Sequence, residues 1–254
     1  MAIAHFLFGI FGNATALFLF LSPTITFKRI IQNKSTEEFS GIPYVMTLLN
    51  CLLAAWYGLP FVSTDNLLVA TINGTGSAIE FIYVIIFLIF APKREKAKIF
   101  GLLMFVLAVF ALVALVSLLA LHENNRKVFC GFGTTIFSII MYASPLSIMR
   151  TVIKTKSVEF MPFFLSLFVF LCGTSWFVYG LLGGDPFVYV PNGFGCGLGT
   201  AQLILYFIYR NKKGGTKKPS STSVEDSLEM GLPKPNQEKK SNTNGSLAQS
   251  EHDV

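Results

Sequence analysis

The sequence is poor in charged residues, and many of those it has lie near one end. Charged residues make up 13% of the 254 positions, against roughly 25% in soluble proteins. Of the 20 Lys and Arg and 14 Asp and Glu, 14 fall in the last 45 residues, which leaves 20 for residues 1–209. With 52% hydrophobic residues, the chain has more apolar surface than a soluble core can use, whereas a bilayer can accommodate it. Soluble enzymes, nucleic-acid-binding proteins and secreted disulfide-rich domains are therefore poor candidates.

Patterns that would indicate catalysis or metal binding are also missing. Cys51, Cys130, Cys172 and Cys196 fall in or beside apolar runs without the spacing of a metal site, and they read as small apolar packing residues. No nucleophile–base set and no Walker A sequence is present. We therefore expect neither an enzyme nor a bound metal or cofactor.

Seven long apolar runs follow one another along the chain. Each has about 20 residues, which at about 1.5 Å per residue span the roughly 30 Å of a hydrocarbon core. Backbone groups in lipid must be hydrogen-bonded within their own element, so these runs are predicted to be helices. The expected spans are His5–Phe27, Pro43–Val62, Leu67–Phe90, Ile99–Leu121, Val128–Met149, Met161–Leu182 and Pro186–Tyr209.

Lys and Arg predict how these helices are oriented. Three lie between the first and second spans, four between the third and fourth, three between the fifth and sixth, and eight after the seventh, whereas the opposite side has only Arg126 and Lys127. The positive-inside rule then places the N-terminus outside and the C-terminus in the cytoplasm. No Lys or Arg precedes Lys28, so we expect no cleavable signal peptide. The plasma membrane is the default location for this multi-pass protein, and an intracellular membrane is the alternative.

An internal repeat relates the two halves of the chain. Four segments recur in register, two at an offset of 122 residues and two at an offset of 119. This agreement indicates a duplicated three-helix unit. The pairs are Ser22-Pro23 with Ser144-Pro145, Lys34-Ser35-x-Glu37 with Lys156-Ser157-x-Glu159, Ile42-Pro43 with Met161-Pro162, and Asn73-Gly74-x-Gly76 with Asn192-Gly193-x-Gly195.

The repeat also predicts the architecture. Both units carry their basic stretch on the same side, but two directly fused three-helix units would point in opposite directions. The span Ile99–Leu121 has no repeat partner, and we interpret it as a linker helix that restores the orientation. We therefore expect an all-α membrane protein with two parallel three-helix repeats joined by one linker helix. The expected divisions are 1–95 (first repeat), 96–122 (linker helix), 123–210 (second repeat) and 211–254, a disordered cytoplasmic tail.

Few polar residues lie within the spans, and such residues usually face a cavity or a partner helix. Asn73 and Asn192 are repeat-equivalent, so a two-fold axis would bring them face to face near the middle of the membrane. Their uncharged amides have donors and acceptors that match sugar hydroxyls. For Asn13 and Asn50, hydrogen bonding between helices is an equally good interpretation.

One acidic residue, Glu80, lies within a span and has Gly199 at the equivalent position. We favour a structural hydrogen bond to Tyr83 or Ser77 over a proton site, because no chain of titratable groups leads to it. Without such a relay, uncoupled downhill transport is the simplest hypothesis.

Aromatic residues and prolines also recur between the halves. Trp176, with Tyr57 at the equivalent position, can stack on the apolar face of a sugar. Four prolines near the expected cytoplasmic helix ends form two equivalent pairs, and such residues bend helices as a gate would require. Ordinary helix punctuation is the alternative. These prolines are Pro23, Pro43, Pro145 and Pro162.

Taken together, these residues resemble the SWEET sugar-transporter family, especially its plant hexose-transporting members, over about residues 1–210. The stretches that carry the resemblance are Gly12-Asn13-Ala14-Thr15, Ser22-Pro23, Ser144-Pro145-Leu146-Ser147-Ile148-Met149-Arg150, Lys156-Ser157-Val158-Glu159-Phe160-Met161-Pro162 and Pro191-Asn192-Gly193. The family is known for parallel repeats about an axis along the membrane normal. The resemblance implies a uniporter that moves glucose-like monosaccharides in both directions by alternating access.

The resemblance also implies roles for particular residues. Leu19 and Met141 match the family's selectivity pair, and their long side chains favour monosaccharides over sucrose. Ala54 and Thr64 depart from residues that relatives often carry, and Thr64 replaces a Lys that would pair with an acid near Asp185. We therefore expect the outer gate to close without that ion pair. The candidate substrate-binding residues are Asn73, Asn192, Trp176, Ala54, Leu19, Met141, Asn50 and Cys172, and the candidate gating residues are Pro23, Pro43, Pro145, Pro162, Tyr57 and Asp185.

Two other functions remain open at this point. A seven-helix signalling receptor shares the helix count and the topology but needs no repeated half. A proton-coupled carrier of small solutes would use Glu80. The expected partners are a monosaccharide and the lipid bilayer but no nucleic acid, and the sequence leaves a homo-oligomer open.

Overall fold

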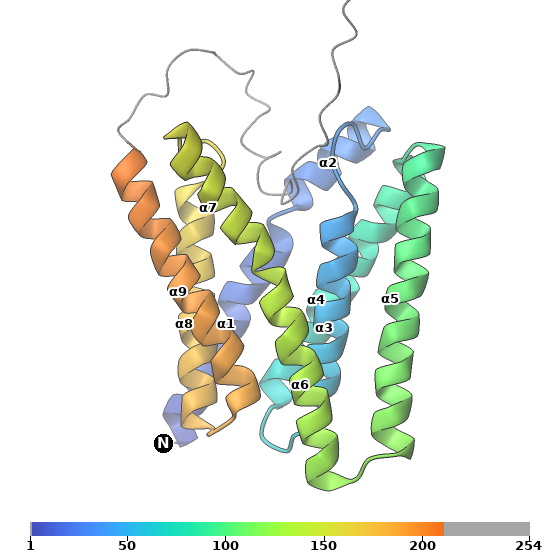
Figure 1. Ribbon diagram of the computed structural model, residues 1–254, viewed down its shortest axis with the longest axis vertical. Coiled ribbons are helices and arrows are strands. Elements are labelled where there is room, and N and C mark those ends of the chain that lie inside the picture. Colours follow the sequence, from blue (N-terminus) through green and yellow to red (C-terminus); the bar gives the residue numbers. More distant parts are fainter. Residues whose placement is uncertain (1, 211–254) are drawn as a thin grey trace, which may run out of the picture.

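Nine helices make up residues 2–210, the part of the chain that this computed structural model describes (Figure 1). Two spans are each built from two helices: α1 (Ala2–Leu21) continues into α2 (Thr24–Asn33), and α6 (Glu123–Met141) continues into α7 (Ala143–Thr155). Five further helices complete the seven expected spans, and no strand occurs in the described residues. They are α3 (Ile42–Tyr57), α4 (Leu67–Phe90), α5 (Lys93–Leu119), α8 (Phe163–Leu182) and α9 (Pro186–Tyr209). The all-α prediction is confirmed.

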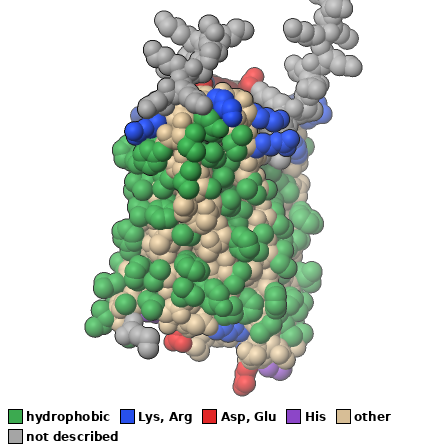
Figure 2. Space-filling model, turned by 60° about the vertical axis from the view of Figure 1, so that its left-hand side comes forward, with side chains coloured by type: hydrophobic (Ala, Val, Ile, Leu, Met, Phe, Trp, Pro, Cys, Tyr) green, Lys and Arg blue, Asp and Glu red, His purple; other side chains and the backbone are tan. Residues whose placement is uncertain are grey.

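The surface is that of a membrane protein. By length and composition, five helical stretches among the described residues can cross a bilayer, namely Ala2–Asn33, Leu67–Phe90, Lys93–Leu119, Glu123–Thr155 and Phe163–Leu182. Hydrophobic side chains cover the sides of the molecule, and Lys and Arg gather at one end (Figure 2). We call this the basic end, because it includes Lys28 and Arg29 on α2 and Lys93 and Arg94 on α5. The opposite end is called the Asp185 end.

The packing of the helices repeats between the two halves. In the first half, α4 packs against α1, α2 and α3, and in the second half α9 packs in the same way against α6, α7 and α8. Between the halves, α1 packs against α8 and its equivalent α6 packs against α3. The remaining helix, α5, packs against α3, α4 and α6. The predicted plan of two three-helix repeats and a linker helix is therefore confirmed.

The linker helix completes the core of the first repeat. Val45 and Leu49 of α3, Val84 of α4, and Ile99 and Val106 of α5 are all fully buried in one cluster. Together they form a wall of β-branched and leucine side chains that packs without polar atoms. The linker helix therefore has a packing role as well as reversing the direction of the chain.

Helix boundaries differ from expectation where polar or helix-breaking residues decide them. α4 and α9 have the predicted bounds. α5 begins at Lys93 instead of Ile99, because a charged segment beyond the lipid can remain helical. α3 ends at Tyr57 instead of Val62, since Pro60 cannot donate a helix hydrogen bond and the segment turns through a bond from the Val62 amide to the Leu59 carbonyl at 2.8 Å.

The repeated Lys-Ser-x-Glu motif forms the same helix-ending turn in both halves. Lys34 after α2 and Lys156 after α7 have φ of 51° and 55°. The Ser35 hydroxyl accepts a hydrogen bond from the Glu37 amide at 3.1 Å, and Ser157 accepts one from the Glu159 amide at 3.3 Å. The motif is thus structural. In the first copy, hydrogen bonds from Asn33 and Arg29 also lower the pKa of Glu37.

Candidate functional site

A cavity of about 250 Å³ lies between the two repeats. All eight candidate substrate-binding residues line it, and they come from six helices. No acidic or basic side chain lines it among the described residues. The eight residues are Leu19 of α1, Asn50 and Ala54 of α3, Asn73 of α4, Met141 of α6, Cys172 and Trp176 of α8, and Asn192 of α9. We call this the central cavity.

The two equivalent asparagines are held in the same way. The Asn73 amide donates to the Val69 carbonyl at 2.9 Å, and the Asn192 amide donates to the Val188 carbonyl at 2.8 Å. Each bond joins the side chain to the preceding turn of its own helix and so fixes its orientation. Among the described residues these amides make no other hydrogen bond, which leaves a carbonyl oxygen and an N–H on each for a ligand.

Asn13 and Asn50 have different environments. Asn13 on α1 donates to the Leu68 carbonyl at 3.2 Å and to the Gly9 carbonyl at 2.9 Å, so it joins α1 to α4. Asn50 lines the central cavity, and its carbonyl oxygen accepts from the Ser138 hydroxyl at 3.0 Å. The structure thus assigns Asn13 to helix packing and places Asn50 at the cavity.

Aromatic rings form much of the cavity wall. Trp176 and Tyr57 both line it and are 6% and 1% exposed. Trp176 also meets Tyr179 edge to face, with ring centroids 5.1 Å apart. These contacts hold the indole ring in place. A rigid aromatic surface beside uncharged amides suits a ligand with hydroxyl groups and an apolar face.

Close packing beside each asparagine depends on the second glycine of the Asn-Gly-x-Gly motif. A Cβ atom at Gly76 would lie 2.6 Å from the Phe20 ring, and one at Gly195 would lie 2.7 Å from the Tyr142 hydroxyl oxygen. Phe20 and Tyr142 are repeat-equivalent at the offset of 122. The tyrosine additionally donates to the Pro191 carbonyl at 2.6 Å. The glycines therefore allow close approach, and the helices around them are continuous instead of unwound.

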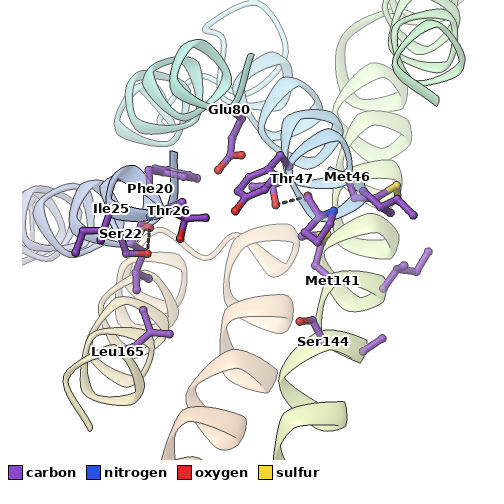
Figure 3. A pocket seen from close by; sticks show the side chains of 17 residues that line it. Phe20, Ser22, Ile25, Thr26, Met46, Thr47, Glu80, Met141, Ser144 and Leu165 are labelled. Atoms are coloured by element: carbon purple, nitrogen blue, oxygen red, sulfur yellow. Dashed lines mark hydrogen bonds between the residues drawn. The ribbon is translucent and has the colours of Figure 1, made fainter. Parts of the chain in front are cut away.

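Leu19 and Met141 lie where the central cavity meets a larger one. Both line the central cavity and also a cavity of about 500 Å³ towards the basic end, shown in Figure 3. We call the larger one the basic-end cavity. Met141 further borders a third cavity of about 270 Å³. These two side chains thus lie at the boundary between the two cavities.

The four candidate gating prolines lie at the basic end in two different settings. Pro23 separates α1 from α2, and Pro145 lies in the first turn of α7, just after the break at Tyr142. Pro43 is in the first turn of α3, and Pro162 directly precedes α8. The first pair accompanies breaks within spans, whereas the second pair stands where helices begin, which is ordinary punctuation. Pro23 and Pro43 line the basic-end cavity, and Pro145 and Pro162 line the third cavity.

The opposite end is held together around one buried carboxylate. Asp185 is 4% exposed. The Tyr57 hydroxyl lies 2.8 and 2.6 Å from its two oxygens, the Asn66 amide donates to it at 2.7 Å, and the Lys127 ammonium lies 3.4 Å away. We call these four residues the Asp185 cluster. They join the ends of α3 and α9 to the α3–α4 loop and to α6, and so link the two repeats at this end.

Sequence reasoning found two members of this cluster and missed the other two. Asn66 precedes α4 as Asp185 precedes α9, at the repeat offset of 119, so the repeat alone could have predicted that they meet. Lys127 has no repeat relation to Asp185, so the repeat could not have predicted this contact. Thr64 does not pair with Asp185, as expected; its hydroxyl lies 3.5 Å from the Asp65 carboxylate. The ion pair is nevertheless present, because α6 supplies it through Lys127.

The prediction that Glu80 makes a structural hydrogen bond to Tyr83 or Ser77 is wrong. Glu80 is 4% exposed, and its Oε2 atom has no hydrogen-bond partner among the described residues. The Ser77 hydroxyl is also buried without a partner in this part of the chain. The Tyr83 hydroxyl instead contacts the Thr24 hydroxyl at 2.9 Å and donates to the Phe20 carbonyl at 3.1 Å. The turn at Ser22-Pro23 brings these groups to Tyr83, so they occupy the hydroxyl.

Comparisons with known proteins agree on one family. The sequence model described as "Sugar efflux transporter for intercellular exchange" matches residues 6–95 and 128–214. The chain is 76% identical over 214 residues to "Bidirectional sugar transporter SWEET1" of Arabidopsis thaliana, covering 84% of this chain and 87% of the relative. It is 66% identical over 230 residues to "Bidirectional sugar transporter SWEET1a" of Oryza sativa subsp. japonica, covering 88% of this chain and 84% of the relative. A solved structure of a eukaryotic SWEET transporter has a TM-score of 0.80 and 48% identity, covering 82% of this chain and 97% of that one.

Proposed function

Because the chain belongs to the SWEET family of sugar transporters, we propose that it carries glucose-like monosaccharides across a membrane by facilitated, bidirectional transport. The observation that carries this proposal is the central cavity, where Asn73 and Asn192 from the two repeats line one uncharged space. Two equivalent amides, one from each repeat, can bind different hydroxyl groups of a small ring. Trp176 then offers a flat apolar surface to the same ring.

The size of the cavity supports a monosaccharide as substrate. About 250 Å³ is slightly below the roughly 300–1,000 Å³ of pockets that hold drug-sized ligands. Leu19 and Met141 narrow the passage towards the basic end. A disaccharide would need these side chains to be shorter or to move. We infer that this pair sets the upper limit on substrate size.

Uncoupled transport is supported by the absence of charge at the site. The described residues that line the central cavity include no Asp, Glu, His, Lys or Arg, so the cavity has no carboxylate, imidazole or amine to carry a coupled proton beside the substrate. A coupled carrier places its ion site next to its substrate. We therefore propose a uniporter that follows the sugar gradient.

Alternating access requires that the two ends open in turn. In this structure the Asp185 cluster joins the repeats at one end, while the basic-end cavity of about 500 Å³ adjoins the central cavity at the other. We propose that sugar binding is followed by opening of the Asp185 cluster and closure around Pro23 and Pro145. If the basic end lies in the cytoplasm, as the positive-inside rule predicts, we propose that this conformation is the inward-facing state and that the protein resides in the plasma membrane.

Labelled glucose uptake tests this function directly. We expect a cell that lacks hexose transport to take up glucose when it expresses the chain, and to lose preloaded glucose at a similar rate. Discharging the proton gradient should leave uptake unchanged. Uptake that collapses with the gradient would instead support a proton-coupled carrier, and no uptake by protein at the surface would contradict sugar transport.

The asparagine pair provides a sharper test. Asn73→Ala and Asn192→Ala should each abolish uptake while the protein still reaches the membrane, because each removes the polar groups from one wall. Asn124→Ala is the matched control, since Asn124 is exposed at the start of α6 and far from the cavity lining. Near-normal transport by both cavity variants would assign the asparagines to packing.

A further inference from the structure

Unpaired polar groups gather at the basic-end cavity, outside the site described above. The Glu80 Oε2 atom is buried without a hydrogen-bond partner among the described residues, and so is the hydroxyl of Tyr44 on α3, a residue that is 4% exposed. Both residues line the basic-end cavity. Burying such groups without a partner is unfavourable, because they lose their hydrogen bonds to water, so a partner that is not part of the protein is to be expected.

The Glu80 carboxyl points into the basic-end cavity, next to the central cavity. Figure 3 shows the Glu80 carboxyl directed into the cavity, on the opposite side from Ser144 and Leu165. Thr47 lies between Glu80 and Met141, and its hydroxyl donates to the Pro43 carbonyl at 2.9 Å. The oxygen of that hydroxyl can therefore still accept a hydrogen bond. Since Met141 also lines the central cavity, a molecule that leaves the asparagines towards the basic end passes this group.

The two polar residues occur in one repeat only. Gly199 stands at the position equivalent to Glu80, and Phe163 stands at the position equivalent to Tyr44, both at the offset of 119. A residue needed only to pack the three-helix unit would be expected in both copies. The Tyr44 ring packs in the core against Phe27 and Tyr83, but Phe163 in the second repeat lacks its hydroxyl, so the hydroxyl and the Glu80 carboxyl are the parts that the repeated fold does not require.

We propose that the basic-end cavity contains a second, weaker sugar subsite, in which Glu80 and Tyr44 bind hydroxyl groups of the monosaccharide as it moves between the central cavity and the basic end. This proposal rests on the proposed function and adds a binding step to it. The carboxyl oxygens accept from sugar hydroxyls, and the Tyr44 hydroxyl both donates and accepts. A sugar there would satisfy the buried groups that the protein leaves unpaired.

A metal or sodium ion fits the same place less well. Hard cations require several oxygen ligands, usually with more than one carboxylate. Glu80 is the only acidic side chain among the described residues that line this cavity, and no group of three or more His, Cys, Asp or Glu converges in the described part of the chain. A neutral ligand with several hydroxyl groups matches the lining better.

Saturation-transfer NMR of D-glucose with the purified full-length protein can detect such weak binding. The measurement is made in an Asn192→Ala background, where the central cavity is impaired. We expect residual glucose binding in this background, and a rise of its apparent dissociation constant by about three- to tenfold when Glu80→Gln or Tyr44→Phe is added, because each loses hydrogen bonds to the ligand. Glu80→Leu should remove the residual binding. Glu95→Leu is the control, since Glu95 also lies at the basic end but pairs with Lys98 outside the cavity.

The outcomes separate the subsite from the proposed function. Residual binding that Glu80→Leu and Tyr44→Phe both leave unchanged would overturn the subsite while central binding by the native chain stands. Loss of all glucose binding in the Asn192→Ala variant alone would likewise overturn the subsite while central binding by the native chain stands. No glucose binding by the native chain would overturn the proposed function and the subsite with it. A sodium or proton dependence of uptake that disappears in Glu80→Gln would overturn the subsite in favour of ion coupling.

Discussion

The hydrogen bond between Tyr57 and Asp185 is expected to keep one end of the transporter closed, and Tyr57→Phe removes this bond while keeping the aromatic ring. The change deletes a hydroxyl that lies 2.8 and 2.6 Å from the two carboxylate oxygens. It keeps the ring, which is 1% exposed and packs edge to face with Phe187 at 6.0 Å. The variant therefore tests the bond with little change in packing.

The magnitude follows from the chemistry of the bond. A hydrogen bond to a charged group contributes about 1.5–3 kcal/mol, and every 1.4 kcal/mol is a factor of ten in an equilibrium. Asp185 keeps three other partners, the Asn66 amide at 2.7 Å, the Phe187 backbone amide at 3.0 Å and the Lys127 ammonium at 3.4 Å. These partners limit the loss, so we expect the lower end of the range. The ratio of closed to open molecules should fall by about tenfold.

Cysteine labelling measures this ratio. Cys172 lines the central cavity, so an impermeant thiol reagent added at the Asp185 end reaches it only when that end is open. Tyr57→Phe should raise the labelling rate of Cys172 by about tenfold, and Cys172→Ala identifies the labelled site. Tyr83→Phe is the control, because it loses a hydroxyl bonded to the Thr24 hydroxyl and the Phe20 carbonyl at the other end. An unchanged rate in Tyr57→Phe would refute the reasoning that this bond holds the Asp185 end closed.

Two further predictions concern the walls of the central cavity. Leu19→Val combined with Met141→Val should admit a disaccharide, because the shorter side chains widen the passage between the two cavities. Sucrose flux in proteoliposomes measures this effect. An absence of sucrose flux would show that the pair does not set the size limit. Gly195→Ala should reduce glucose uptake by at least about tenfold, because its Cβ would lie 2.7 Å from the Tyr142 hydroxyl oxygen. Gly197→Ala, which meets nothing within 4 Å among the described residues, should transport normally, and equal transport by both variants would contradict a role for this contact.

Much of the fold could be predicted because its causes are local or repeated. Lipid requires each span to satisfy its own backbone hydrogen bonds, so length and hydropathy were enough to locate α4 with its observed bounds. The equal offsets of the repeated motifs then predicted which helices correspond. The ends of α3 and α5 were less accurate, because they depend on Pro60 and on charged residues beyond the lipid.

The environment of particular side chains was harder to predict. The sequence suggested Tyr83 as a partner for Glu80, but the turn at Ser22-Pro23 brings the Phe20 carbonyl and the Thr24 hydroxyl to Tyr83 instead. Lys127 showed no pattern that would link it to Asp185, since the two residues come from different helices and have no repeat relation. Such contacts depend on distances between helices, which hydropathy does not contain.

By itself, the sequence determined that this chain crosses a membrane as two like-oriented three-helix units with a helix between them. The hydrocarbon core requires long apolar runs, and the duplication repeats the same motifs at nearly constant offsets, so both can be recognised in the sequence. Only the tertiary structure decided which groups share a cavity, which carboxyl is paired and which is not, and which contacts link the two repeats. The physical reason is that burial and hydrogen bonding are properties of several helices packed together, and a single helix does not specify its neighbours.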